Sequence, residues 1–465
     1  MEFICGSYVW WLLTLSWLPL WGSWREATER ASGSAATAIF LLEKLVDFVS
    51  FSSRMVLEVD KMLIERPKYL EKLIKYKDKD LIKVITGVRR CGKSVLLFDI
   101  YSDYLTKIGV KAENIIKINL EHKSNVALRN SDAIYSFVSE KIKNNKEKHY
   151  VMIDEIQYVN DFEDLVNTLK DDGCDLYITG SNSKMLSGDI STALRGRSIE
   201  IRVFTLSFAE YYSYTGGDNT EAFKDYLLYG GFPYVATEND PELKVQYLKM
   251  LQETIATKDV VERYGIRNYQ AFYATYDFLS SNIGSYVSAK KIADTLKSGG
   301  YKNITPDTIG NYLNWLCESF LFAKVYRYDI KGREYLKTQN KYYAADLGLR
   351  NSRLNFRQIE PTHALENLIY LELVRRGYNV DIGKNRDKEI DFIASNSKET
   401  FYIQVAYTIS DPEKRAQEIG SFRNIDDGYK KIVITMDTDP FTILERGYKK
   451  INVIDFLLNE NSMNI

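Results

Sequence analysis

The chain has 465 residues, more than a single hydrophobic core usually spans, and its length therefore predicts two or three domains. A formal net charge of −1, with 27% charged residues, excludes a global electrostatic attraction to nucleic acid or to a membrane surface. The four cysteines are scattered without metal-ligand spacing, which excludes a dense disulfide framework and favours a reducing, cytoplasmic compartment.

Residues 1–61 differ in composition from the rest of the chain. Five of the six tryptophans lie there, within an uncharged stretch from residue 3 to residue 24. Glu2 takes the place of a leading basic residue, and Pro19 and several glycines and serines interrupt the apolar run, so a membrane partner is not expected. We interpret this segment as an atypical extension from a misassigned start, with a membrane segment as the alternative.

A glycine-rich motif follows a short apolar strand predicted at residues 81–86. It reads Gly87-Val88-Arg89-Arg90-Cys91-Gly92-Lys93-Ser94 and matches G-x-x-x-x-G-K-[ST] at every fixed position. In such a loop, backbone N–H groups and the start of the next helix point at phosphate oxygens. Lys93 supplies a positive charge to the β- and γ-phosphates, and Ser94 supplies a magnesium ligand. The motif predicts a P-loop that binds ATP and Mg²⁺, in a domain that spans 62–215.

Residues 149–157 read as a second buried strand, and it ends in the two acids Asp154 and Glu155. Asp154 is expected to hold the magnesium ion through water. Glu155 is expected to polarise the water that attacks the γ-phosphate. The pair favours ATP hydrolysis over simple binding, and an ordinary pair of acids at a strand end is the alternative.

A third predicted strand, at 174–179, runs into polar residues. Because ligands collect at the carboxyl ends of parallel strands, Ser181 or Asn182 is a candidate sensor of the γ-phosphate. Further along, Arg197 is a candidate arginine finger, offered in cis or to a neighbouring subunit. The second arrangement requires a homo-oligomer, whereas a plain surface arginine is the alternative.

The motifs taken together resemble a known family. In chain order they read G-V-R-R-x-G-K-S, I-D-E-I-Q, I-T-G-S-N-S, L-x-x-R-x-R, L-S-F-x-E-Y and Y-G-G-F-P. This combination resembles a prokaryotic family of AAA-type ATPases, whose members usually carry a C-terminal domain of unknown function with a restriction-endonuclease-like fold. The resemblance runs from residue 62 to the end of the chain. It implies an α/β fold with ATP binding and hydrolysis more firmly than any biological role.

Residues 216–341 are predicted to form a helical region that is followed by a winged helix-turn-helix. Helical spacing from 221 to 282 precedes two segments with the N-caps Ser288 and Thr305 and an alternating wing strand at 322–329.

Ten lysines and arginines against five acids between residues 287 and 341 leave a local excess of +5, enough for several phosphate contacts. The second helix of this unit offers few base-reading groups beyond Asn311 and Asn314. DNA without specific base readout is therefore a candidate partner, and a protein partner is the alternative.

Residues 342–465 are predicted to form an α/β nuclease-like domain. A helix at 364–373 precedes three strands, at 379–382, 388–394 and 400–406. In the nuclease fold that this order resembles, a helix Glu, a strand Asp and an acid-x-Lys triplet bind magnesium and activate water. Glu366 and Asp391 fit the first two positions, but Gln404-Val405-Ala406 supplies neither the acid nor the lysine. We predict an inactive module that is retained for binding or packing.

Two functions of different classes follow from these motifs. In the first, Glu155-dependent ATP hydrolysis switches or moves the C-terminal domains. In the second, ATP occupancy controls a DNA- or protein-binding module that has little turnover. A nucleotide-gated nuclease is a third and weaker alternative.

Overall fold

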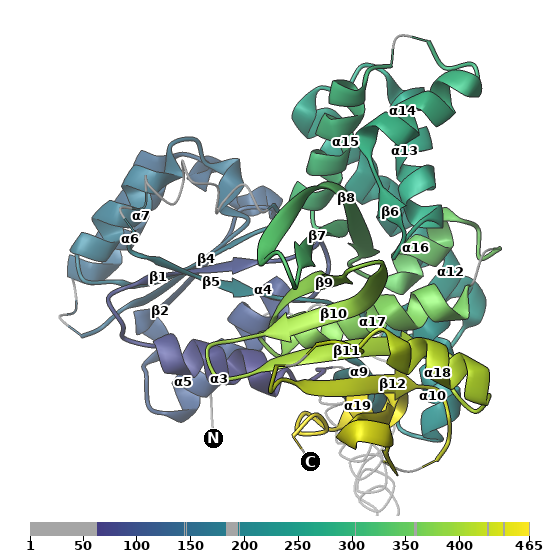
Figure 1. The fold of residues 1–465 in the computed structure, drawn as a ribbon. Helices are drawn as coiled ribbons and strands as arrows, with labels where there is room; N and C mark the ends of the chain where they lie inside the picture. The colour runs from purple at the N-terminus through teal and green to yellow at the C-terminus, as the bar shows by residue number, and fades with distance from the viewer. Residues whose placement is uncertain are drawn as a thin grey trace, which may run out of the picture. The chain divides into compact units, whose positions relative to one another are not determined.

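The computed structural model describes residues 63–465 except 144, 146, 183–193, 195, 303, 358–359, 426, 440–441 and 465. The expected extension at 1–61 lies outside the described residues. Contacts group Glu65–Ile465 into one compact unit, which contains two β-sheets (Figure 1).

The first sheet has five parallel strands in the order β2-β3-β4-β1-β5. They are β1 (Ile82–Thr86), β2 (Ile115–Asn119), β3 (Tyr150–Asp154), β4 (Asp175–Gly180) and β5 (Ser198–Arg202). β1, β3 and β4 are buried along their whole length, which explains their unbroken apolar runs. The three strands predicted in this part of the chain are confirmed, and β4 lies between β1 and β3.

Helices cover both faces of this sheet (Figure 1). On one face, α6 (Ser131–Lys143) and α7 (Phe162–Asp171) pack apolar side chains such as Ile134 and Leu165 against the strands. The other helices that the structure describes before β5 are α3 (Pro67–Tyr76), α4 (Lys93–Val95), η1 (Leu96–Tyr101), α5 (Ser102–Lys107), η2 (Ala112–Asn114), η3 (Lys123–Leu128) and η4 (Ile156–Tyr158).

A helical region follows β5. Its helices are α9 (Phe208–Thr215), α10 (Asn219–Tyr229), α11 (Pro233–Thr237), α12 (Pro241–Thr254), the π-helix η6 (Ile255–Glu262) and α13 (Tyr269–Ser281). α9 begins with a capping box, in which the Ser207 side chain accepts from the Glu210 N–H and the Glu210 side chain accepts from the Ser207 N–H. The helical spacing predicted from 221 to 282 is thus present as four helices and a π-helical turn.

Two helices and three strands come next. They are β6 (Tyr286–Val287), α14 (Ala289–Ser298), α15 (Pro306–Glu318), β7 (Phe322–Asp329) and β8 (Glu334–Ala344). Ser288 and Thr305 cap the two helices, as predicted, by accepting from the Lys291 and Thr308 N–H groups. β8 pairs antiparallel with both β6 and β7.

The C-terminal part alternates helices and strands. Its elements are α16 (Leu347–Arg353), α17 (Pro361–Arg375), β9 (Asn379–Asn385), β10 (Lys388–Ser395), β11 (Thr400–Ala406), α18 (Pro412–Gly420), β12 (Lys430–Thr435), β13 (Thr442–Ile443), η7 (Glu445–Gly447), β14 (Lys449–Asn452) and α19 (Val453–Leu458). β9, β10 and β11 form an antiparallel meander, and β12 pairs parallel with β11.

The second sheet joins two regions that were predicted as separate domains. Its order is β13-β14-β12-β11-β10-β9-β7-β8-β6, and the join is the parallel pair β7–β9. The domain boundary expected between residues 341 and 342 falls inside β8. A break at this position would cut a strand that is hydrogen-bonded on both sides, so the two regions share one sheet.

The backbone of residues 203–206, directly after β5, forms hydrogen bonds with distant parts of the chain. The Val203 N–H donates to Thr86 O at 2.7 Å, and the Leu206 N–H donates to Gly231 O at 2.7 Å. Arg66 Nη2 donates to Phe204 O at 2.9 Å, and Arg375 Nη2, from α17, lies 3.3 Å from Leu206 O. This short segment therefore ties the first sheet to the helical region and to α17.

Asp346 joins α16 to the loop after α10. Its buried carboxylate accepts from the N–H groups of Gly231 (2.8 Å), Gly348 (2.9 Å) and Leu349 (3.2 Å). Burial raises the pKa of Asp346 although these hydrogen bonds oppose the rise. Gly230 has a φ of +75°, and a Cβ there would lie 2.1 Å from Asp346 Oδ1, so both the glycine and the carboxylate are needed in this turn.

Replacing Asp346 by alanine is expected to lower the free energy of unfolding by about 2–4 kcal/mol, because buried N–H groups lose their acceptor. The control is Asp240→Ala: Asp240 also caps a helix, α12, but is exposed and accepts from the Glu242 N–H. This control should cost about 1 kcal/mol. Urea unfolding measures both values, and equal losses would contradict the bridging role of Asp346.

Candidate functional site

The predicted P-loop leaves the carboxyl end of β1 in a backbone conformation that requires its glycines. Gly87 has a φ of +150°, and a Cβ there would lie 2.1 Å from Val203 O. Gly92, with a φ of +101°, leads into α4. The Cys91 side chain is buried and its S–H donates to Val203 O at 3.4 Å. The loop is thus pressed against the segment that follows β5.

Lys93 lies on the inside of this loop. Its side chain is buried, and its ammonium donates to Gly87 O at 2.9 Å and to Val88 O at 3.1 Å. A buried cation that is held by two neutral carbonyls of a glycine-rich loop suits an anionic ligand such as a phosphate.

Two hydroxyls hold the Asp154 carboxylate at the end of β3. Ser94 Oγ, in the helix after the loop, donates to Asp154 Oδ2 at 2.8 Å. Thr179 Oγ1, in β4, donates to Asp154 Oδ1 at 2.5 Å. The predicted magnesium residues Ser94 and Asp154 therefore meet. Thr179 lies in the I-T-G-S-N-S motif, but no role for it was predicted from the sequence because its bond to Asp154 forms only in the folded sheet.

Glu155 follows in a strained conformation. Its φ of 56° and ψ of 52° lie in the left-handed region, which a glutamate seldom adopts. Its N–H donates to Thr179 Oγ1 at 3.0 Å, and its carboxylate accepts from Gln157 Nε2. The neighbouring strand thus fixes the backbone of Glu155 beside Asp154.

The end of β4 brings polar groups to the same edge of the sheet. Asn182 is buried, and its Nδ2 donates to the Tyr264 hydroxyl at 3.1 Å. Ser181 Oγ is buried and has no hydrogen-bond partner among the described residues. A buried hydroxyl of this kind suits a site that a polar ligand completes.

The two arginines of the loop differ in their surroundings. Arg89 Nε and Nη2 lie 3.0 and 3.1 Å from the two carboxylate oxygens of the buried Asp259, and Nη1 lies 3.0 Å from Glu121 Oε1. The hydrogen bonds that Arg89 donates to the Asp259 carboxylate raise the pKa of Arg89 above its usual range. Arg90, by contrast, is exposed and has a φ of 67°. Arg89 therefore joins the loop to η6, which was not predicted.

Arg197 lies away from the P-loop. Its carbonyl accepts from the Ile82 N–H, so it stands at the amino end of β1, whereas the loop follows the carboxyl end. These ends are separated by about 16 Å of strand. The Arg197 guanidinium also pairs with Asp171 at 2.8 Å. A role in cis is excluded by this position, and a role toward a neighbouring subunit stays a prediction.

Arg66 supports the loop from outside it. Its Nη1 donates to Cys91 O at 3.2 Å, and its Nε pairs with Glu210 Oε1 at 2.8 Å. The guanidinium is buried and stacks over the Tyr69 ring. A single arginine before a proline carries no pattern that would have identified it in the sequence.

The acids of the predicted nuclease-like module surround a lysine. Lys341 Nζ, from β8, lies 2.8 Å from Glu366 Oε1 and 2.6 Å from Glu389 Oε1. The Tyr343 hydroxyl donates to Glu366 Oε1 at 2.5 Å. Lys341 was counted in the predicted basic patch, but it is 4% exposed and so cannot contact phosphates there.

Asp391 and Gln404 have other partners. Asp391 Oδ2 accepts from the Val405 N–H at 2.8 Å, and burial together with the nearby Glu366 holds the pKa of Asp391 well above its usual range. Gln404 bonds to Glu418 and Ser421. Across the described residues, no group of three or more His, Cys, Asp or Glu side chains is arranged to hold a metal ion.

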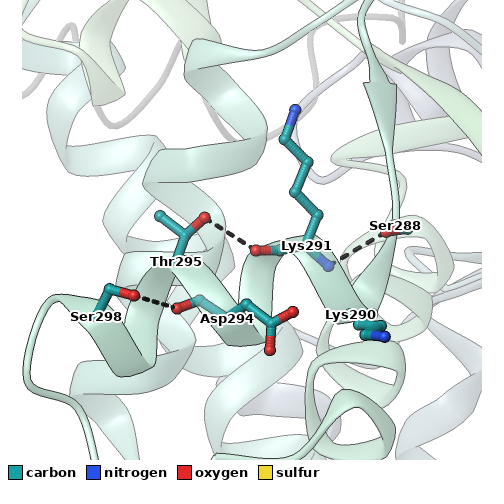
Figure 2. Close-up of a pocket in the computed structure, with 6 residues that line it drawn as sticks. All are labelled: Ser288, Lys290, Lys291, Asp294, Thr295 and Ser298. Atoms are coloured by element: carbon teal, nitrogen blue, oxygen red, sulfur yellow. Dashed lines mark hydrogen bonds between the residues drawn. The ribbon is translucent and has the colours of Figure 1, made fainter.

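The rest of the basic patch is partly available. Lys290, Lys291 and Lys297 on α14 are exposed, as are Lys331 and Arg333 at the tip of the β7–β8 hairpin. α14 also lines an open surface hollow of about 440 Å³ (Figure 2). Figure 2 shows Lys290 and Lys291 pointing in different directions, while the hydroxyls of Thr295 and Ser298 bond to backbone carbonyls of α14. The hollow presents scattered positive charge and contains none of the P-loop residues.

In the described part of the chain, no helix has the length and apolar character that a bilayer crossing requires.

Comparisons with known families identify two parts of the chain. Residues 79–212 match the family described as AAA domain, and residues 220–360 match a domain of unknown function, DUF8612. The resemblance to AAA-type proteins is thereby confirmed. The match to the domain of unknown function covers most of the helical region and the segment from β6 to α16. It begins far upstream of residues 342–465, where the nuclease-like module stays a prediction.

Two relatives match most of the chain. An uncharacterized protein of Haemophilus influenzae is 39% identical over 406 residues, which are 86% of this chain and the whole of the relative. An uncharacterized protein of Methanocaldococcus jannaschii is 31% identical over 392 residues, which are 80% of this chain and 85% of that protein. Both alignments therefore extend well beyond the segment that matches the AAA domain.

Among solved structures, the Aeropyrum pernix ORC1 protein in complex with DNA is similar at 12% identity. The match covers 63% of this chain and 93% of that chain, with a TM-score of 0.28. A similarity this low carries no argument about the present protein.

Replacing Asp391 by asparagine is expected to stabilise the protein near neutral pH by a few degrees in Tm. Because the folded-state pKa of Asp391 is raised, its ionised form destabilises the fold, and this penalty grows as pH rises above about 4, the pKa of an unfolded aspartate. Asparagine stays neutral, so its advantage should vanish near pH 4. Thermal unfolding between pH 4 and pH 7.5 measures the difference.

The matched control for this series is Asp387→Asn, which changes an exposed aspartate in the turn between β9 and β10. It should leave the pH profile of Tm unchanged. An Asp391→Asn protein that is less stable than the parent at pH 7 would contradict the raised pKa of Asp391 in the folded protein.

Proposed function

Because the chain belongs to a family of AAA-type P-loop proteins, we propose that it binds ATP with Mg²⁺, hydrolyses it, and uses hydrolysis to switch the arrangement of its later regions. The observation that carries this proposal is the bonding of Asp154 to Ser94 and Thr179, with Glu155 directly beside it. This arrangement brings the hydroxyl after the P-loop, the strand-end acid and a second acid to one edge of the sheet, as phosphoryl transfer requires.

The residues present fit a magnesium ion. Mg²⁺ usually takes one or two protein oxygens and completes its shell with water and substrate phosphates. Ser94 would supply a protein oxygen to the ion, and Asp154, whose Oδ2 lies 2.8 Å from Ser94 Oγ, would hold it through water. When bound, the ion neutralises negative charge on the β- and γ-phosphates.

Each of the other residues has a role that its position supports. Lys93 offers its ammonium to the phosphates from inside the loop. Glu155 accepts a proton from the attacking water or orients it, since it directly follows Asp154 at the carboxyl end of β3. Asn182 is the candidate sensor of the γ-phosphate. Arg197, half-buried just before the amino end of β5, can serve another subunit's site in a homo-oligomer but not its own.

The segment from α13 to β8 supports a winged helix. Its order is helix, strand, two helices and two strands, and β6 pairs with the last strand. α15 takes the position of the helix that reads bases in DNA-binding winged helices. It contains Asp307 and Glu318 and no lysine or arginine. Base readout by α15 is therefore disfavoured.

The second candidate function is a nucleotide-dependent module that binds the DNA backbone. The exposed lysines of α14 and the hairpin tip favour it, because they can contact phosphates without reading sequence. A protein partner for the same surface is the alternative.

The C-terminal part supports an inactive nuclease-like module. Its order is a helix, an antiparallel meander, a helix and a parallel strand. Lys341 lies among the acids where a nuclease would bind a cation, so its ammonium balances their charge. A nucleotide-gated nuclease is therefore not favoured.

Glu155→Gln is expected to keep ATP binding within about threefold while it lowers the turnover number by about 100-fold or more, because it removes the carboxylate but keeps the shape. Lys93→Ala should lose ATP binding itself, since it removes the buried charge. Binding is measured by calorimetry, and turnover by phosphate release, each on the full chain with Mg²⁺.

Phosphate release is also measured with double-stranded DNA. An increase with DNA that disappears in Lys93→Ala would support a DNA-coupled ATPase. Unchanged turnover in Glu155→Gln would refute Glu155 as the base. ATP binding without turnover in the parent protein would favour the nucleotide-dependent binding module.

A further inference from the structure

A chain of hydrogen bonds leads from the sensor position to the last turn of α15. Asn182 Nδ2 donates to the Tyr264 hydroxyl at 3.1 Å, and that hydroxyl donates to Glu318 Oε2 at 2.5 Å. The second bond joins a hydroxyl to a carboxylate, the stronger class of hydrogen bond. Asn182 at the end of β4 is thereby connected to α15 through one tyrosine.

A second connection starts at the P-loop and ends at Ser319, the residue after Glu318. Arg89 pairs with the Asp259 carboxylate at 3.0 and 3.1 Å, and the Ser319 hydroxyl donates to Asp259 O at 3.0 Å. Asp259 and Ser319 are buried. The sensor position and the P-loop are therefore each connected to residues 318–319, the first through Tyr264 and the second through Asp259.

Both connections pass through the end of the helix α12–η6. Asp259 lies within the π-helix η6, and Tyr264 lies just beyond it. π-helical turns are rare and are frequent at functional sites, because they shift the side chains that follow. Here the turn directs Asp259 and Tyr264 toward the loop and the sensor.

The Tyr264 ring adds an apolar contact to α15. It stacks on Trp315, with the ring centres 4.8 Å apart and the planes 11° apart. Trp315 and Glu318 are three residues apart, so they lie on one face of α15. That face points to the nucleotide site, which agrees with the absence of lysine and arginine from this helix.

We propose that Tyr264 is a positioning residue that transmits occupancy of the γ-phosphate site to α15. This inference rests on the proposed ATP binding. The Asn182 amide has two N–H donors, so a γ-phosphate that accepts from one of them turns the amide whose other N–H bonds the Tyr264 hydroxyl. The bond from Tyr264 to Glu318 then changes, and the Trp315 face of α15 shifts. The negative charge of the phosphate acts in the same direction by competing with Asp259 for Arg89.

The test follows Trp315 by fluorine NMR in the full chain labelled with 5-fluorotryptophan. The Trp315 resonance is the one that is missing from a Trp315→Phe protein. Adding AMP-PNP with Mg²⁺ should move this resonance in the parent protein. In Tyr264→Phe, which keeps the ring but loses the hydroxyl, the movement should fall to about a third or less, while the affinity for AMP-PNP stays within about threefold.

Two further variants separate coupling from folding. Glu318→Gln removes the charge of the acceptor and should also reduce the movement. Tyr273→Phe is the matched control, because among the described residues Tyr273 bonds an acid, Glu253, at 2.7 Å but bonds neither Asn182 nor Arg89, and it should keep the full movement.

The outcomes distinguish this inference from the function on which it rests. A parent protein that does not bind AMP-PNP would refute the proposed function and this inference together. Binding without movement of the Trp315 resonance would refute the inference alone. Full movement in both Tyr264→Phe and Glu318→Gln would likewise overturn the role of Tyr264.

Discussion

The pairing of the backbone at residues 203–206 is the constraint on which the rest of the structure depends. Buried N–H and C=O groups outside regular structure need partners, and here these come from Thr86, Tyr69, Arg66, Gly231 and Arg375. The same segment presses against the P-loop, where a Cβ on Gly87 would collide with Val203 O. The geometry of the loop therefore depends on residues from the start, the middle and the end of the unit.

The nucleotide site follows from the parallel order of the first sheet. Because β4 lies between β1 and β3, the P-loop, the acids and the sensor reach one edge. The side chains that turn toward this edge from outside the sheet, Arg66, Asp259 and Tyr264, connect it to the helical region and α15. A ligand at the edge is thus in contact with groups that belong to several elements.

The sequence could predict the parts of this site that follow local rules. A glycine spacing after an apolar strand identifies the P-loop, and acids at a strand end identify Asp154 and Glu155. The N-caps Ser288 and Thr305 were found in the same way. It could not predict partners that meet only in three dimensions. Arg89 and Asp259 are 170 residues apart, and the count of basic residues could not show that Lys341 is buried among acids.

The central claim is that the nucleotide site and α15 form one coupled unit. Hydrogen–deuterium exchange of the Glu155→Gln protein, with and without ATP and Mg²⁺, tests it most directly, because exchange reports local opening of each element. The account predicts changed exchange in the P-loop and also in peptides that cover η6 and α15. Changes confined to the P-loop and the end of β3 would contradict it.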